Sequence, residues 1–248
     1  MPQAVIESVR QRVAQARQIC AFTGAGMSAE SGIPTFRDAL EGMWARFDPM
    51  QLATEEGFRR DPATVWAWYA ERRTGILAAE PNAGHLALGD FARRHPGRLT
   101  VVTQNVDNLH QRAGNPEAIR LHGDIAADRW LDPCPRGRAC APAQAAPGVP
   151  PRCAECGNPL RPGVVWFGEM LPEANVHAAE AAAKGCDLML VVGTSGAVWP
   201  AAGLAGLARR AGAWVVVINP QPSDLDDEAH DCLRGTAAGL LPQLLDRL

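Results

Sequence analysis

Residues 19–38 read ICAFTGAGMSAESGIPTFRD, and the rest of the chain is best understood from this stretch. Its first four residues, Ile19 to Phe22, are apolar and predict a short buried strand. The spacing Gly24-x-Gly26-x-x-Ala29 then fits the glycine turn of a dinucleotide site. The first glycine permits the tight turn, and the second lets backbone N–H groups approach a pyrophosphate. Taken alone, a plain strand-to-helix turn explains this short motif equally well.

The helix expected after this turn is interrupted by Gly32-Ile33-Pro34, because proline removes a donor and disfavours helix at the preceding residue. An ordinary dehydrogenase would instead continue through a helix and a strand to an acidic residue for the ribose. The segment resembles the nucleotide-binding signature of the sirtuins, the NAD-dependent protein-lysine deacylases. The matching residues are Gly24-Ala25-Gly26-x-Ser28-Ala29-Glu30-Ser31-Gly32-Ile33-Pro34-x-Phe36-Arg37.

The length, composition and net charge of the chain fit a cytoplasmic protein. Its 248 residues, 47% of them hydrophobic, suffice for one large domain with an insertion. A net charge of −3 argues against electrostatic binding to nucleic acid or to an anionic membrane. No apolar run is long enough to span a bilayer, and no signal peptide is visible. We expect a monomer. We also expect its seven cysteines to be thiols or metal ligands in preference to disulfides.

Apolar runs alternate with helical patterns over much of the chain. This order predicts an α/β fold, with a Rossmann-like parallel sheet and helices on both of its faces. Ligands of such sheets bind beyond the carboxyl ends of the strands. Small or polar groups follow four predicted strands there, namely Gly24-Ala25-Gly26, Gln104-Asn105-Val106-Asp107, Gly193-Thr194-Ser195 and Asn219-Pro220.

Two segments depart from this alternation and predict a small insertion domain. Residues 39–80 are rich in aromatic side chains and look helical, with the best helix from Phe58 to Thr74. Residues 126–163 are rich in proline, glycine and cysteine and resemble a zinc ribbon. We therefore expect an NAD-binding domain made of residues 1–38, 81–125 and 164–248, and a small domain made of these helical and cysteine-bearing modules.

The segments Gln104-Asn105-x-Asp107 and Leu121-His122-Gly123 extend the resemblance to the sirtuins. It implies that Asn105 orients ribose or water, that Asp107 binds the carboxamide, and that His122 is the general base on a ribose hydroxyl. An imidazole suits that role because it titrates near neutrality. The implied reaction consumes NAD and yields free lysine, nicotinamide and O-acyl-ADP-ribose. The implied NAD contacts are Gly24, Ala25, Gly26, Ser28, Glu30, Phe36, Arg37, Gln104, Asn105, Asp107, Gly193, Thr194, Ser195, Asn219 and Ala237.

The clearest clue to the substrate is Tyr69-x-x-Arg72 in the helical segment. Positions i and i+3 share one face of a helix, and a phenol beside a guanidinium suits a carboxylate. The pair resembles the Tyr-x-x-Arg of sirtuins that remove succinyl, malonyl or glutaryl groups, and Ala39 matches the small residue of their acyl pocket. An ordinary surface pair is the alternative. Val165-Trp166-Phe167-Gly168-Glu169 resembles the segment that pairs with the backbone of an acyl-lysine peptide.

The cysteine segment predicts one structural zinc ion. The motif Cys153-x-x-Cys156 has the spacing typical of two of the four ligands of such a site. Trp130 stands where the first cysteine of the other half is expected in the family, which leaves Cys134 and Cys140 to complete the set. A module that packs without metal is the alternative. We expect the remaining cysteines, Cys20, Cys186 and Cys232, to be plain thiols.

Two other functions fit parts of this pattern. A noncatalytic reader or scaffold that binds NAD or ADP-ribose would have no need of the base His122. A hydride-transferring oxidoreductase is disfavoured by Pro34 and by the missing ribose acid. The sequence therefore favours a deacylase that acts on succinyl, malonyl and also acetyl lysine.

Overall fold

The computed structural model describes residues 3–34, 52–135, 140 and 145–246. The chain forms two compact units. The larger unit consists of Met1–Thr35, Ala79–Leu121 and Leu171–Leu248, and the smaller unit of Phe36–Ala78 and His122–Met170. None of the helices in the described ranges is long and apolar enough to cross a membrane.

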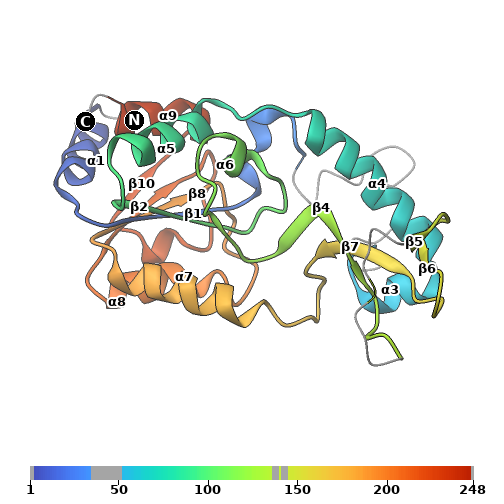
Figure 1. The fold of residues 1–248 in the computed structure, drawn as a ribbon. Coiled ribbons are helices and arrows are strands. Elements are labelled where there is room, and N and C mark those ends of the chain that lie inside the picture. Colours follow the sequence, from blue (N-terminus) through green and yellow to red (C-terminus); the bar gives the residue numbers. More distant parts are fainter. Residues whose placement is uncertain (1–2, 35–51, 136–139, 141–144, 247–248) are drawn as a thin grey trace. The chain divides into compact units, whose positions relative to one another are not determined.

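The larger unit is built on one parallel sheet of six strands in the order β10-β9-β8-β1-β2-β3 (Figure 1). The first strand lies in the middle, with residue 23 beside both Thr103 and Val192. Its carboxyl end therefore meets those of β2 and β8 at one edge of the sheet. The strands are β1 (Ile19–Thr23), β2 (Leu99–Thr103), β3 (Ile119–Arg120), β8 (Leu188–Val192), β9 (Trp214–Ile218) and β10 (Asp231–Leu233).

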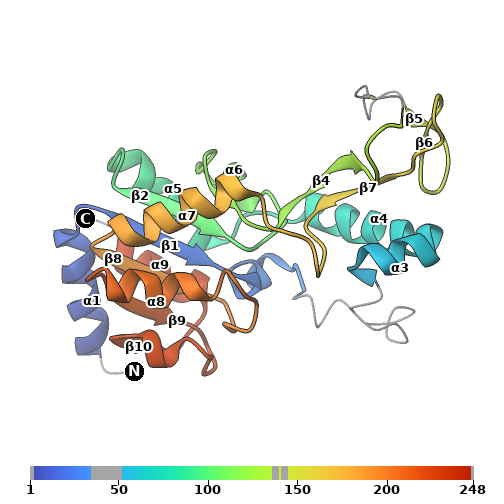
Figure 2. The ribbon, with the colours of Figure 1, turned by 90° about the horizontal axis from the view of Figure 1, so that it is seen from below.

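Helices cover both faces of this sheet, as the sequence predicts. Successive strand residues point to opposite faces, so Ile19 and Ala21 join one core cluster while Cys20 and Phe22 join another. The first cluster is covered by α1 (Gln3–Gln15), α5 (Ala83–Arg94) and α9 (Ala237–Leu245), and the second by α7 (Glu173–Gly185) and α8 (Gly203–Arg210) (Figures 1 and 2). A short helix, α6 (Leu109–Arg112), follows β2.

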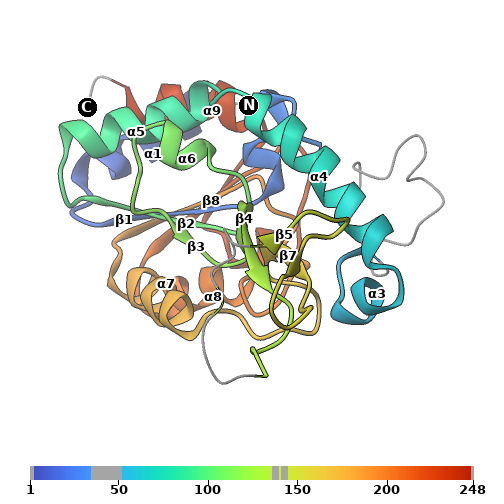
Figure 3. The same ribbon diagram turned by 45° about the vertical axis from the view of Figure 1, so that its right-hand side comes forward.

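The smaller unit combines a helical part and a β part (Figure 3). The β part pairs β4 (Gly123–Trp130) with β7 (Leu160–Val164) in an antiparallel two-stranded sheet. A second pair, β5 (Ala145–Ala146) and β6 (Arg152–Cys153), carries part of the cysteine segment. The helices are α3 (Glu55–Arg60) and α4 (Pro62–Ala78).

The single helix predicted from Phe58 to Thr74 is in fact divided into α3 and α4. Asp61 separates them with an extended φ of −143°, because a residue before proline is disfavoured in the α region. Its side chain accepts the backbone N–H of Thr64 at 3.1 Å and so satisfies a donor of the first turn of α4. Asn82 caps α5, since its side chain accepts the N–H groups of Gly84 and His85 at the start of that helix.

Candidate active site

The glycine turn after β1 packs directly against the turn after β8. The N–H groups of Gly24 and Gly26 donate to the carbonyls of Val192 and Gly193 at 2.9 and 2.8 Å. A Cβ atom at Gly26 would lie 2.8 Å from the Cα of Gly193, and one at Gly24 would lie 2.7 Å from the Cβ of Thr194. Both positions therefore need glycine for contact between two loops. The N–H of Gly26 itself is thus engaged within the protein.

The segment after the turn forms two short 3₁₀ turns, Ala25–Met27 and Ala29–Ser31, in place of an α-helix. The second ends at Gly32, whose φ of 80° suits glycine. The interruption predicted from Pro34 is thus observed. The predicted site residues Phe36, Arg37 and Ala39 lie outside the described residues.

Ser28, Asn105 and Asp107 form a buried hydrogen-bonded group in the larger unit. The Ser28 hydroxyl donates to Oδ2 of Asp107 at 2.8 Å and accepts Nδ2 of Asn105 at 3.0 Å. Oδ1 of Asp107 accepts the N–H of Leu109 at 3.1 Å. The Asn105 side chain is thus held by the bond that it donates to Ser28. The structure thus joins Ser28 to two other predicted NAD-contact residues, which lie 77 and 79 positions further along the chain.

A second polar group links the ends of β2, β8 and β9. Nε2 of Gln104 donates to the Thr194 hydroxyl at 3.0 Å, and Nδ2 of Asn219 donates to the Thr194 carbonyl at 3.2 Å. Ser195 is the exposed neighbour of this group. The polar residues predicted beyond these three strands therefore lie together at one edge of the sheet.

Glu30 lies against the first turn of α9. Its carboxylate accepts the N–H of Ala238 at 3.0 Å, where the positive end of the helix dipole favours negative charge. This contact brings Glu30 beside Ala237, another of the predicted NAD contacts. The bond ties the glycine segment to the last helix of the chain.

His122 opens the second segment of the smaller unit, just before β4. Its carbonyl accepts the N–H of Val165 at 2.8 Å, and its side chain is half-buried. The next residue, Gly123, has a φ of 85°, and a Cβ there would lie 2.3 Å from the Gly163 carbonyl oxygen. The start of the β4–β7 pair therefore fixes the backbone that carries the imidazole.

Tyr69 and Arg72 share one face of α4, as predicted. Tyr69 is 4% exposed and its hydroxyl accepts the indole N–H of Trp166 at 3.1 Å. Burial raises the pKa of the phenol to about 12, so it is a neutral hydrogen-bonding group at pH 7. Burial also lowers the pKa of Arg72, whose guanidinium carbon lies 4.6 Å from the centre of the Trp68 ring. A cation in such surroundings favours an anionic ligand.

The predicted peptide-pairing segment is held through its own backbone. The N–H groups of Val165 and Phe167 donate to the carbonyls of His122 and Ala53, and that of Trp166 donates to the carboxylate of Glu169 at 2.8 Å. A substrate strand would therefore pair through other groups of the segment. Phe167 and Gly168 are its exposed residues.

One buried residue of this region was missed by the sequence analysis. Arg161 is 1% exposed, forms an ion pair with Glu169, and donates to the Val164 carbonyl at 2.7 Å. Its guanidinium carbon stacks 3.3 Å from the centre of the Trp166 ring. Its position in a proline- and glycine-rich segment gave no signal that it would be buried.

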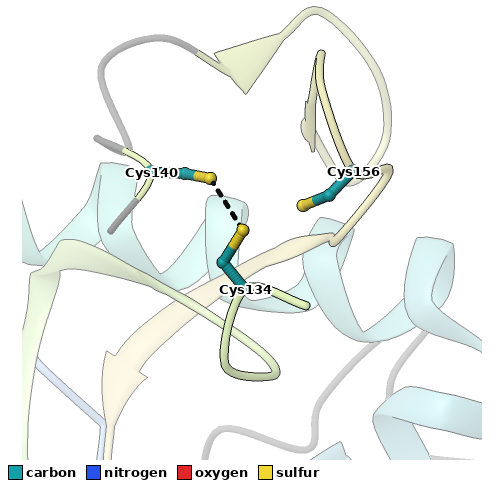
Figure 4. A group of neighbouring side chains, drawn as sticks. All are labelled: Cys134, Cys140 and Cys156. Atoms are coloured by element: carbon teal, nitrogen blue, oxygen red, sulfur yellow. Dashed lines mark hydrogen bonds between the residues drawn. The ribbon is translucent and has the colours of Figure 1, made fainter. Parts of the chain in front are cut away.

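Three cysteines of the smaller unit point toward one another (Figure 4). The sulfur atoms of Cys134, Cys140 and Cys156 all lie within 4.8 Å of one another, a spacing at which they can hold a zinc ion. The fourth predicted ligand, Cys153, is not part of this close set. Backbone N–H groups of Cys156 and Glu155 lower the pKa of Cys153 to about 7, which favours a thiolate. The donor set therefore fits zinc.

Comparison with known proteins gives the family. A family model described as the Sir2 family matches residues 24–200. The chain belongs to the Sir2 family. A relative from Ralstonia nicotianae called "NAD-dependent protein deacylase" is 52% identical over 250 residues, which cover 99% of this chain and all of the relative. The resemblance to the sirtuins is thus confirmed over almost the entire chain.

Solved Sir2 structures share the fold. The crystal structure of a Sir2 homologue in complex with NAD is 40% identical, with a TM-score of 0.86 over 96% of this chain and 92% of that one. A Sir2 protein bound to a propionylated peptide is 27% identical, with a TM-score of 0.82 over 99% of this chain and 98% of that one. The predicted α/β fold of the Rossmann-like type is confirmed by these matches and by the parallel sheet.

Proposed function

We propose that this Sir2 protein removes succinyl and malonyl groups, and also acetyl groups, from lysine side chains of proteins. The chain is an NAD-dependent protein deacylase, because it belongs to the Sir2 family and is similar in sequence to enzymes with that name. NAD supplies the ADP-ribose that takes up the acyl group. The proposed products are free lysine, nicotinamide and O-acyl-ADP-ribose.

We assign the following roles to the residues of this chain. The larger unit is the NAD-binding domain, in which the Ser28–Asn105–Asp107 group presents the Asn105 amide oxygen and the Asp107 carboxylate to polar groups of the ligand. The hydrogen bonds inside the group fix these orientations before a ligand arrives, which reduces the entropy lost on binding. The imidazole of His122 takes a proton from a ribose hydroxyl.

The acyl specificity rests on the Tyr69–Arg72 pair. The phenol is a neutral donor at pH 7, because burial raises its pKa to about 12, and the half-buried guanidinium beside it is a cation. Succinyl and malonyl groups end in a carboxylate, which takes one hydrogen bond from a phenol and a fork of two from a guanidinium. An acetyl group lacks the carboxylate, so its removal does not depend on this pair.

Replacing both side chains tests this assignment. In Tyr69→Phe/Arg72→Met we expect kcat/KM for a succinyl-lysine peptide to fall at least tenfold, because hydrogen bonds to a charged group contribute about 1.5–3 kcal/mol each. The value for the acetyl-lysine version of the same peptide should change far less. Both are measured as nicotinamide released from NAD under one set of conditions. Equal losses on the two peptides would contradict the proposed carboxylate recognition.

The role of His122 is tested by His122→Ala. We expect deacylation of every acyl peptide to be lost while the fold and its thermal transition are retained, because the half-buried side chain leaves no large cavity. Circular dichroism checks the fold and nicotinamide release checks the chemistry. Full activity in this variant would refute the assignment of the base.

We further propose that the protein acts in the cytoplasm. None of its seven cysteines, all of which are described by the structure, is in a disulfide, as expected in a reducing compartment. The alternatives of a noncatalytic reader and of a hydride-transferring enzyme have no specific observation in their favour.

A further inference from the structure

The indole of Trp166 makes a directional contact with the only tyrosine of the chain. Trp166 is 2% exposed, and its Nε1–H donates to the hydroxyl oxygen of Tyr69 at 3.1 Å. An indole N–H can only donate, so the Tyr69 oxygen must accept in this bond. A phenol has one proton, and that proton must therefore point away from Trp166.

Charged neighbours hold the indole in place. Arg161 stacks on its ring at 3.3 Å from the centroid, and Glu169 accepts its backbone N–H at 2.8 Å. Arg161 and Glu169 form an ion pair with each other, and Arg129 adds two hydrogen bonds to the same carboxylate at 2.8 and 2.9 Å. A side chain fixed at both its ring and its backbone keeps the direction of its N–H.

The phenol is held on its other side by the helix. Tyr69 packs edge-on against the Trp68 ring at 4.7 Å between centroids, and Arg72 lies one helical turn further along α4. The Tyr69 ring therefore has little freedom to turn away from Trp166. The remaining freedom is the rotation of the hydroxyl proton, and the indole restricts it.

We propose that Trp166 is a positioning residue for carboxylate recognition: by occupying the acceptor side of the Tyr69 hydroxyl, it directs the phenolic proton toward the carboxylate of the acyl group. This inference rests on the proposed recognition of succinyl and malonyl groups by Tyr69 and Arg72. Without the indole N–H, the hydroxyl would rotate among several partners, and part of the binding energy would be lost in ordering it. An acetyl group does not use the hydroxyl, so the effect is confined to acyl groups that carry a carboxylate.

The substitution Trp166→Phe removes the N–H and keeps an aromatic ring for Arg161. We expect KM for a succinyl-lysine peptide to rise about fivefold, the size of one hydrogen bond, with kcat little changed. Any change for the acetyl peptide should be smaller, so that the ratio of succinyl to acetyl kcat/KM falls about fivefold. Trp66→Phe is the matched control, because it makes the same change on the same helix as Tyr69 and should leave both peptides unaffected.

A spectroscopic measurement observes the hydroxyl itself. Since Tyr69 is the only tyrosine, the tyrosine Fermi doublet in the Raman spectrum reports its hydrogen bonding alone. The intensity ratio of the doublet distinguishes an accepting from a donating phenol. It should shift in Trp166→Phe and stay unchanged in Trp66→Phe. An unchanged doublet in Trp166→Phe, or equal losses on the two peptides, would overturn the inference.

A double-mutant cycle separates this inference from the function on which it rests. In a Tyr69→Phe background, Trp166→Phe should have no further effect on the ratio of succinyl to acetyl activity. A further loss there would refute action through the phenol. If Tyr69→Phe itself leaves the ratio unchanged, the proposed carboxylate recognition fails. If Tyr69→Phe lowers the ratio and Trp166→Phe does not, only the positioning role fails.

Discussion

His85 and His110 are buried side by side in the larger unit, with ring centroids 4.9 Å apart. His110 shares a hydrogen bond of 2.9 Å with the Thr23 hydroxyl at the end of β1. Within the described ranges, neither ring nitrogen of His85 has a hydrogen-bond partner. Burial lowers the pKa of His85 to about 4 and that of His110 to about 3. Both rings are therefore neutral in the folded protein at pH 7.

This pair predicts a loss of stability on acidification. Below about pH 6.5 the unfolded chain takes up protons on both histidines while the folded protein does not. The free energy of unfolding should therefore fall by up to about 1.4 kcal/mol per pH unit for each ring, until the folded-state pKa values are reached. Above pH 7 the pair contributes no pH dependence.

The variant His85→Leu measures how much one of the two rings contributes to this pH dependence of stability. It should reduce the difference in unfolding free energy between about pH 7.5 and about pH 5.5, as determined by chemical denaturation at each pH. Only this difference is compared, so a general change in stability does not affect the result. A difference equal to that of the parent protein would contradict the buried, neutral state of His85.

At the scale of elements, one glycine decides how α5 packs. A Cβ atom at Gly89 would lie 1.7 Å from the carbonyl oxygen of Ala113, in the turn that follows α6. Gly75 in α4 differs from Gly89, because a Cβ atom added there would have no atom within 4 Å. The two glycines look alike in sequence, since each interrupts a helical pattern.

The same substitution at these two sites should act in opposite directions. Gly89→Ala should destabilise the larger unit by more than about 2 kcal/mol, because the overlap with backbone forces α5 away from its neighbour. Gly75→Ala should stabilise by about 0.5–1 kcal/mol, the difference in helix propensity between the two residues. Thermal unfolding of both variants beside the parent protein checks this. A stabilised Gly89→Ala would show that the close approach is absent.

At the scale of the whole molecule, the cysteine group decides whether the smaller unit depends on metal. Between β4 and β7, the described residues 131–135, 140 and 145–159 contain only the short strands β5 and β6, so a zinc ion would supply much of the order there. Strong chelation should therefore lower the thermal stability and raise hydrogen exchange in the smaller unit. The parallel sheet should keep its protection, because its core is apolar and far more extensive.

Metal content tests the fourth ligand. We expect one zinc ion per chain by native mass spectrometry, and its loss in Cys153→Ala, because closed structural sites use four ligands. Cys232→Ala is the control, since Cys232 lies in β10 outside the cysteine segment and should leave the zinc in place. Full zinc occupancy in Cys153→Ala would remove that residue from the ligand set.

Much of the fold and part of the site could be predicted from local patterns. The strand at Ile19, the cap at Asn82 and the interruption before Pro34 each depend on a few neighbouring residues, and the structure contains all three. The division of one predicted helix at Asp61 was missed, although the proline that causes it is visible in the sequence. Such features follow from backbone geometry, so a short stretch suffices to determine them.

Only the tertiary structure decided which distant groups meet. Ser28 bonds to residues 77 and 79 positions away because β1 and β2 are adjacent and in register. The indole of Trp166 meets the phenol 97 positions before it, and Arg161 is buried beneath that contact. Periodicity and propensity describe a residue and its neighbours along the chain, whereas these contacts depend on strand order and on how α4 packs against the β4–β7 pair.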